Sequence, residues 1–597
     1  MTLLPADGRL VKIGGASAMW GDSAIATPQL LTVPGLNYLS YDYLAETTMS
    51  IMARAKARNP QAGYATDFVA AAMAENLAVI AVKRVKVLSN AGGLNPEACR
   101  AALLAIADKA QIKVNVAVVQ GDDILDRTDA LRRDGWRDLN GAPLPSRLLS
   151  ANAYLGARAI ASALDRGADI VITGRVVDSA FALAALVHEF GWRWDDWDKL
   201  AQATLAGHII ECGAQGSGGL FTDWDAVPDW ANIGYPVVEC ASDGSFTVTK
   251  PDNTGGLVVP AAVAEQVLYE IGDPAAYVMP DVTCDFREVR VAASGPQRVR
   301  VTGACGRPAP DSYKVSATWQ DGYRLDALMA IRGIKAAAKA EKTAAAVLER
   351  TRAMMAARGF GDYSETLVEL LGTEALYGPH ARARETREVV LRLAVRHPDK
   401  AALEFLRREV TSPGTSMGPG TRGHFGGRSD IQPIVRLCSF LVSKAMVTVE
   451  LNCAGTTTRL PPDAAAPATP PAPAVAPPAA PPDAAGPGIT VPLARLAYAR
   501  SGDKGNSSNI GVIPRQPGYW PYLAAALSAE RVAAHFAHLC NGAVDRYILP
   551  GLPALNFVLQ DALGGGGMAS LRSDPLGKSF AQILLDLPVQ VPRHLLG

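Results

Sequence analysis

Small clusters of glycine and polar residues follow the predicted strands of the N-terminal half, and these residue types can bind and hold an anionic ligand. Two clusters are rich in glycine and three carry charged side chains: Gly14 and Gly15; Asn90, Gly92 and Gly93; Asp42; Asp122 and Asp123; and Gly174, Arg175 and Asp178. Glycine lets a ligand approach the backbone, and arginine can hold an anion through two parallel hydrogen bonds. Ordinary turn and cap chemistry also places these residue types in loops, so the residues alone leave both interpretations open.

A second group of chemically capable residues lies within five positions of the chain. His208, Glu211 and Cys212 precede a glycine-rich stretch at residues 213–219. These side chains could supply a base, an acid and a nucleophile. The spacing is not that of a metal motif, because no second histidine follows at helical spacing. A buried histidine and a core thiol are the simpler alternative.

The C-terminal region contains one polar connection that is unusually rich in hydrogen-bonding groups. Residues 500–509 include Ser501, Asp503 and Lys504 between two apolar stretches that read as strands. A plain hairpin connection needs only about two to five residues. We therefore expect a functional loop here, the alternative being a solvated loop without a ligand.

Several common cofactor and catalytic motifs are absent from the sequence. None of the strand-end loops has the GxGxxG spacing of a dinucleotide site, and the sequence has no GxxxxGK[ST] stretch for ATP, no paired-cysteine zinc motif, and no lysine in the setting that biotin requires. Residues 414–418 match GxSxG, but Pro413 and Pro419 flank them, which argues against the strand–turn–helix of a serine hydrolase. No metal-ligand spacing is present either, so the cofactor is left open.

Composition narrows the class of partner. The chain of 597 residues carries 58 basic and 58 acidic residues, which argues against nucleic acid or an anionic membrane as a partner. No apolar run reaches the roughly 18 residues of a membrane span, and the N-terminus does not resemble a signal peptide. The eight scattered cysteines indicate reduced thiols. We expect a cytoplasmic protein with a small-molecule substrate, and a homo-oligomer.

The elements that must position these side chains alternate between strand and helix over residues 1–280. Strands are predicted at residues 10–13, 37–43, 85–89, 113–119 and 169–173, and helices at 96–109, 152–166 and from Asp178 onward. Alternation at this spacing predicts right-handed crossovers and an α/β domain with a mostly parallel, Rossmann-like sheet. In such a sheet the polar clusters would meet beyond the carboxyl ends of the strands.

The rest of the chain predicts two further domains and a linker. Residues 281–460 read as an α+β domain with antiparallel strands and one long helix at 325–358. Residues 461–488 contain 11 prolines and 11 alanines, which predicts an extended tether rather than a helix or a central strand. Residues 489–597 read as a small α+β domain that closes with a strand at 580–587.

Five stretches together resemble a known family. Residues 11–17, 88–96, 120–123, 172–179 and 500–505 are similar to the acyclic terpene utilisation protein family of the AtuA type. The resemblance spans nearly the whole chain apart from the proline-rich tether. It implies a ferredoxin-like fold for the C-terminal domain. It also implies a role in the catabolism of branched acids of the citronellol or geraniol type, beside acyl-CoA enzymes, but it assigns no catalytic residues.

Three functions are consistent with these residues. The first is an enzyme that hydrates, dehydrates or cleaves a branched-chain carboxylate or acyl-CoA by acid–base catalysis. Asp42, Asp122 or Asp123 would be its base, Arg175 and the backbone at Gly92 and Gly93 would hold the anion, and Lys504 with Asp503 would close the site. The second is a thioester or amide hydrolase that uses Cys212 or an activated water. The third is a non-catalytic subunit that binds an acyl-CoA.

Overall fold

The computed structural model describes residues 8–422, 429–461, 472, 475, 481 and 488–596, and its largest element is a sheet of 11 strands. Five neighbouring strands at the centre run parallel, in the order β1-β2-β3-β6-β4. These are β1 (Leu10–Ser17), β2 (Tyr38–Tyr41), β3 (Lys86–Ser89), β6 (Ile170–Thr173) and β4 (Val116–Gln120). Their residues are almost all buried, as expected for parallel strands covered on both faces.

The outer strands of this sheet are antiparallel, so the sheet is mixed. Beyond β1 lie β7 (Val237–Ala241), β8 (Phe246–Thr249), β12 (Arg298–Thr302) and β11 (Arg290–Gly295). Beyond β4 lie β19 (Glu450–Cys453) and β20 (Thr456–Arg459). The prediction of a mostly parallel, Rossmann-like sheet is therefore not confirmed. The strand–helix alternation correctly identified the central strands, but it carried no information on the hairpins that extend both edges.

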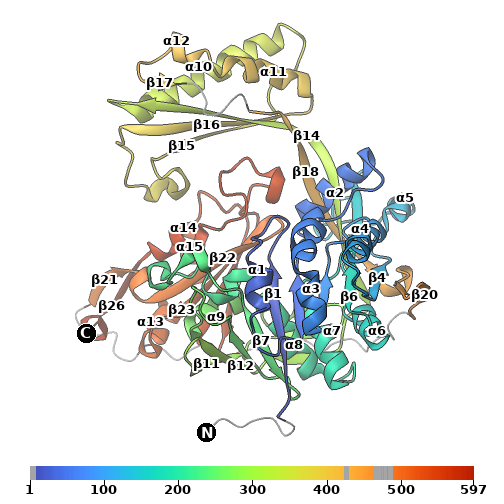
Figure 1. Cartoon of the computed structure of the whole chain (residues 1–597). Coiled ribbons are helices and arrows are strands. Elements are labelled where there is room, and N and C mark those ends of the chain that lie inside the picture. The colour runs from blue at the N-terminus through green and yellow to red at the C-terminus, as the bar shows by residue number, and fades with distance from the viewer. Residues whose placement is uncertain are drawn as a thin grey trace.

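Helices cover both faces of the central strands (Figure 1). On one face α1 (Ala26–Leu30), α2 (Glu46–Arg58), α3 (Ala74–Lys83) and α4 (Pro96–Lys109) share a core with Leu39, Val87 and Val118. On the other, α6 (Arg158–Asp165), α7 (Ala180–Phe190) and α8 (Trp197–Ile210) share a core with Tyr38, Leu88 and Ala117. Neighbouring strand residues thus point to opposite faces, as the pleat requires. No described helix is both long and apolar enough to cross a bilayer.

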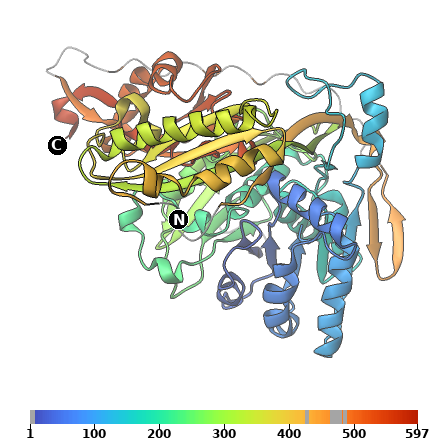
Figure 2. The same ribbon diagram turned by 90° about the horizontal axis from the view of Figure 1, so that it is seen from above.

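A second sheet forms a separate lobe, drawn at the top of Figure 1. Its axis is β14 (Ser312–Arg332), which pairs in its first half with β5 (Ser150–Ala153) and β18 (Gln432–Ser443), and in its second half with β16 (Glu388–His397) and β17 (Thr421–Arg422). The outer strand β15 (Glu365–Leu371) pairs with β16. Figure 2 shows α10 (Ala336–Ala356) and α11 (Lys400–Glu409) lying across this sheet. The short helix α12 (Pro413–Ser416) follows.

The predicted helix at residues 325–358 is only partly correct. Its first eight residues continue β14, and the helix begins at Ala336. Leu325, Ala327, Met329 and Ile331 are buried at every second position, which is the period of a strand with one covered face. The alanine-rich composition obscured that period. The predicted helix at 152–166 is shorter for a similar reason, because its first residues belong to β5.

The C-terminal domain is a small sandwich that packs beside the large sheet (Figure 1). Its four-stranded sheet has the order β22 (Ala497–Lys504), β23 (Ser507–Pro514), β25 (Ala554–Leu559), β24 (Val544–Leu549). A separate pair joins β21 (Gly488–Pro492) to β26 (Pro588–Pro592). The helices are α13 (Trp520–Ala526), α14 (Ala529–His535) and α15 (Phe580–Leu585). The Ser528 side chain caps α14 by accepting from the Arg531 backbone N–H.

Two sequence-based expectations for this domain are wrong. Residues 580–585 form helix α15 rather than a closing strand, and their buried side chains include Phe580, Ile583 and Leu584 at helical spacing. The polar stretch 500–509 is not a long loop. Nearly all of it lies in β22 and β23, which a two-residue turn at Gly505 and Asn506 joins. Gly505 has φ +63°, which that tight turn favours.

Two buried asparagines fasten the C-terminal domain to the segment that follows α9 (Pro260–Leu268). Asn509 donates to the Leu268 carbonyl at 2.7 Å. Asn556 donates to the carbonyls of Ile271 and Gly272 at 2.8 and 2.7 Å. Both amides are buried and bonded to backbone carbonyls, so they fix the position of the C-terminal domain against the large sheet. Most of the predicted tether at 461–488 lies outside the described residues.

Candidate active site

The acidic residues at the carboxyl ends of the central strands lie in a buried cluster. Asp42 directly follows β2, and Asn90 directly follows the neighbouring strand β3. The Asn90 amide donates to Asp42 Oδ1 at 2.5 Å and accepts from the Tyr43 backbone at 2.7 Å. Burial raises the pKa of Asp42 well above its ordinary range, and the charge of Asp178 adds to the rise. Asp42 is therefore held close to other carboxylates with little access to water.

Arg175 connects two of these carboxylates. Its backbone N–H donates to Asp122 Oδ2 at 2.8 Å, and its guanidinium donates to Asp178 Oδ1 at 2.5 Å. The guanidinium also stacks on the ring of Tyr154, with 4.2 Å from Cζ to the ring centroid. Arg175 is 3% exposed, so this ion pair is shielded from water on the arginine side. Burial raises the pKa of Asp122 to about 6, although the bonds from Arg175 and Asn152 act in the opposite direction.

His208 and Glu211 lie at the end of α8 and face each other. His208 Nε2 lies 3.1 Å from the Gln266 carbonyl, which can only accept, so this nitrogen carries the proton. His208 Nδ1 then faces Glu211 Oε1 at 3.1 Å as an acceptor. Burial, and then the charge of Lys504, lower the pKa of His208 to about 4. Burial, and then the charge of Asp178, raise the pKa of Glu211 well above its ordinary range. Burial thus favours the uncharged imidazole of His208 and the protonated form of Glu211.

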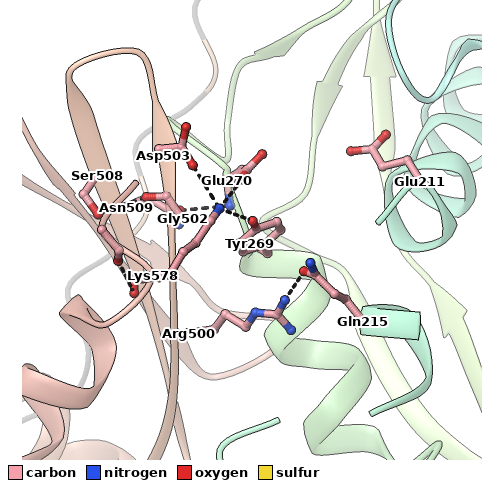
Figure 3. Close-up of polar contacts among 12 residues, drawn as sticks. Glu211, Gln215, Tyr269, Glu270, Arg500, Gly502, Asp503, Ser508, Asn509 and Lys578 are labelled. Carbon is pink, nitrogen blue, oxygen red and sulfur yellow. Dashed lines mark hydrogen bonds and ion pairs between the residues drawn. The ribbon is translucent and has the colours of Figure 1, made fainter. Parts of the chain in front are cut away.

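The β22–β23 hairpin of the C-terminal domain brings further charges to this cluster (Figure 3). Lys578 bonds Glu270 at 3.0 Å and Asp503 at 2.9 Å, and it also bonds the Tyr269 hydroxyl. Burial alone would raise the pKa of Glu270, but the ammonium groups of Lys578 and Lys504 lower it overall. Burial alone would lower the pKa of Lys578, but Glu270, Tyr269 and Asp503 raise it overall. These groups therefore remain charged and fix the hairpin beside the cluster.

Arg500 and Ser501 of the same hairpin serve the packing of the domain. Arg500 bonds the Gln215 side chain, as Figure 3 shows, and its Cζ lies 4.6 Å from the Tyr269 ring centroid. Ser501 Oγ donates to the Gly577 carbonyl at 2.7 Å and accepts from the Ala581 backbone at 3.0 Å. The polar groups of both side chains bond to other protein groups, so in this arrangement both residues have a structural role.

A cavity of about 430 Å³ opens between the two lobes and the C-terminal domain, next to the cluster. Asp178, Lys504 and Tyr277 line it, and Lys314 and Asp273 contribute two more charged side chains. Most of the remaining wall is apolar: Val177, Val278, Met279, Pro280, Pro310 and Leu441. A concave site with a largely apolar wall and a few charged groups at one end suits a small amphipathic ligand.

The predicted glycines pack against protein atoms. A Cβ on Gly15 would lie 2.2 Å from the Ile210 carbonyl oxygen, and one on Gly14 would meet the Leu30 side chain at 2.8 Å. Gly92 closely approaches Thr173 and Pro96, Gly93 approaches Met52, and Gly174 approaches the Asp122 carboxylate. These glycines let strands, helices and carboxylates pack closely. Asp123 is exposed, and its carboxylate accepts from the Leu125 backbone, outside the buried cluster.

Sequence reasoning missed three residues of the site. Tyr277, Glu270 and Lys578 come from regions far from the strand-end clusters. Glu270 has φ +56°, an uncommon conformation for a residue other than glycine, but only the structure reveals it. Tyr277 lies in a two-residue strand with no distinctive pattern, and Lys578 is an isolated lysine after a proline–glycine turn. Their roles depend on which distant segments the fold brings together.

Two alternative chemistries gain no support from the geometry. Burial, and then the charge of Glu211, raise the pKa of Cys212 well above its ordinary value, so its sulfur is a thiol rather than a nucleophilic thiolate. In the part of the chain that the structure describes, no three histidine, cysteine, aspartate or glutamate side chains are grouped to hold a metal ion.

Comparison with known proteins identifies both parts of the chain. A family described as acyclic terpene utilisation family protein AtuA matches residues 11–453. A second description, the AtuA ferredoxin-like domain, matches residues 491–590. The expected ferredoxin-like fold of the C-terminal domain is thereby confirmed. No curated protein and no solved structure matches the chain.

Proposed function

The chain belongs to the acyclic terpene utilisation family AtuA, and from this premise we propose that it is a catabolic enzyme acting on a branched-chain carboxylate or acyl-CoA. We propose hydration, dehydration or related lyase chemistry by acid–base catalysis. The observation that carries the proposal is a pair of carboxyl groups in contrasting environments, one lining the cavity and one in the buried cluster next to it. Asp178 lines the cavity and is paired with a guanidinium, whereas burial favours the protonated form of Glu211. Such pairs divide the roles of base and acid between them.

Dehydration of a 3-hydroxyacyl compound illustrates what each residue would do. The Asp178 carboxylate, which lines the cavity, removes the proton from the carbon next to the carbonyl. The electron pair forms the carbon–carbon double bond and the hydroxyl leaves with the proton of Glu211, which yields water. Hydration is the reverse sequence. His208 holds the Glu211 carboxyl through Nδ1, and the Arg175 guanidinium bonds the Asp178 side chain and orients it.

Mass spectrometry on a panel of thioesters tests the reaction class. The purified protein is incubated with saturated, 2-enoyl, 3-hydroxyacyl and branched glutaconyl thioesters of CoA, and with the corresponding free acids. A mass change of one water, or a smaller acyl product, is the expected result. Release of free CoA would instead indicate a hydrolase. Binding without any change in mass would indicate a non-catalytic subunit.

Two variants test the assignment of acid and base. We expect Glu211→Gln and Asp178→Asn each to lower kcat by at least about 100-fold, since each removes one proton-transfer group. Glu265→Gln is the matched control. Glu265 is also buried, and burial raises its pKa to about 7, but its carboxylate accepts from the Thr222 backbone rather than pairing with His208 or Arg175. If all three variants keep wild-type turnover, the assignment is wrong even where the reaction class is right.

A further inference from the structure

Tyr277 lines the cavity and packs against His208 of the buried cluster. It belongs to β9 (Tyr277–Val278), which pairs with β10 (Thr283–Asp285) so that Tyr277 lies opposite Cys284. Its ring packs between His208, at 5.8 Å between ring centroids, and Phe286, at 5.3 Å. The strand pairing and the two rings fix the direction of the phenol.

The phenol has no hydrogen-bond partner among the residues that the structure describes. A partly buried phenol normally finds such a partner, so its donor is directed at something that the protein does not supply. Glu211 Oε2 is buried and likewise has no partner within the described part of the chain. Both groups adjoin His208, whose Nδ1 lies 3.1 Å from Glu211 Oε1 and whose ring centroid lies 5.8 Å from that of Tyr277. Their unused hydrogen-bonding capacity is therefore available to one ligand.

We propose that Tyr277 is a catalytic residue whose hydroxyl donates a hydrogen bond to the carbonyl oxygen of the substrate. The inference rests on the proposed function and adds the orientation of the substrate to it. The carbonyl lies at Tyr277, the reacting carbons lie between Asp178 and Glu211, and the apolar chain follows the wall formed by Val278, Met279 and Leu441.

This placement gives Tyr277 a defined part in the chemistry. When Asp178 removes the proton beside the carbonyl, the electron pair moves onto the carbonyl oxygen, and the phenol stabilises the resulting oxyanion. The pair then returns to form the double bond as the hydroxyl leaves with the proton of Glu211. Burial, followed by the charges of Glu211 and Asp178, raises the pKa of Tyr277, so the phenol keeps its proton throughout.

The test compares Tyr277→Phe with Tyr363→Phe. The first variant keeps the ring between His208 and Phe286 and removes only the donor. Tyr363 is the matched control because its hydroxyl is buried without a hydrogen-bond partner in the described chain, in the core of the upper lobe. Turnover of the thioester panel is measured with calorimetric binding of the same compounds. We expect Tyr277→Phe to lower kcat by about 100-fold with KM changed much less, and Tyr363→Phe to match the wild type.

Each outcome separates this inference from the proposed function. If the wild type turns over a thioester and both variants match it, Tyr277 has no catalytic role although the function stands. If the wild type turns over none, the proposed function fails, and binding decides the role of the phenol. A thioester that binds Tyr277→Phe about five-fold more weakly than Tyr363→Phe would support the hydrogen bond to the carbonyl. Equal binding, or none, would overturn it.

Discussion

At the residue scale, the site depends on acidic groups that the fold keeps from ionising together. Asp42, Asp178 and Glu211 lie within electrostatic range of one another, and the Arg175 guanidinium bonds directly to Asp178. Several carboxylates in one buried site cannot all be charged without a large cost, so protons remain on some of them. Burial favours the protonated forms of Asp42 and Glu211, whereas Asp178 has the Arg175 guanidinium as a direct partner.

The same physics predicts how Asp122 affects stability. Its folded-state pKa of about 6 lies above its ordinary value of 3.8. Between these values the folded state binds more protons than the unfolded state, so stability falls as pH rises through this window. Above pH 6 the penalty is complete and amounts to about 3 kcal/mol. We expect Asp122→Asn to remove this part of the pH dependence, as measured by urea unfolding at pH 4 and pH 7.5. Asp123→Asn, at an exposed neighbour, should leave the difference unchanged.

Some of the candidate residues could be found from the sequence because strand ends are recognisable. Asp42, Arg175 and Asp178 follow predicted central strands, and the structure brings them together with His208, Glu211 and Lys504. Their catalytic roles remain predictions. The sequence could not separate buried Asp122 from exposed Asp123, because adjacent residues point to opposite sides. Tyr277 and Lys578 could not be found, because only the packing of distant segments brings them to the cluster.

At the element scale, helices and strands with strong local sequence signals were predicted accurately, and those with weak signals were not. Helix α4 has the predicted bounds, with Pro96 at its first position. Helix α15 and the second half of β14 were assigned to the wrong class. In both cases the residues are short, apolar stretches whose period is ambiguous over six to eight positions. The partner strand or core that settles the choice lies elsewhere in the chain.

The crossing of β1 and α8 gives a prediction at this scale. A Cβ on Gly15 would lie 2.2 Å from the Ile210 carbonyl oxygen, so Gly15→Ala must move β1 away from the end of α8. We expect a loss of about 3 kcal/mol in the free energy of unfolding, and lower turnover because that helix end carries His208 and Glu211. Gly361→Ala is the control, since nothing lies within 4 Å of its added Cβ. Equal denaturation midpoints for the two variants would contradict the close crossing.

At the scale of the whole molecule, a buried ion pair fastens the upper lobe to the C-terminal domain. Arg392 on β16 bonds Glu369 on β15 at 2.5 Å and the Leu571 carbonyl at 2.6 Å. Glu369 in turn accepts from the Ser573 hydroxyl at 2.9 Å. These residues lie on the face of the upper sheet opposite to α10 and α11, toward the C-terminal domain (Figure 1). The upper lobe is therefore attached to the rest of the molecule at two places. One is strand β14, and the other is this ion pair with its bonds to the C-terminal domain.

Removing one partner of this pair should be more damaging than removing both. Arg392→Met leaves the Glu369 carboxylate buried without its counter-charge, and we expect a loss of about 3–5 kcal/mol in the free energy of unfolding. The double variant Arg392→Met, Glu369→Met should recover much of that loss. Arg332→Met breaks the exposed pair between Arg332 on β14 and Glu388 on β16 of the same sheet, and it should cost less than about 1 kcal/mol. Denaturant titration of all four proteins measures these differences. A double variant as unstable as Arg392→Met would show that the apolar pair cannot fill the site.

The antiparallel pairing of β19 with the edge of β4 joins two strands that are synthesised at very different times. β4 emerges early from the ribosome, but its outer partner β19 is made only after the whole upper lobe. Until then the edge of β4 presents unpaired backbone groups, which are a template for pairing with another chain. Strand β5 likewise stays without its partner until β14 has been synthesised. The nascent chain thus carries an open sheet edge through most of translation, a period in which aggregation competes with folding and in which chaperones act.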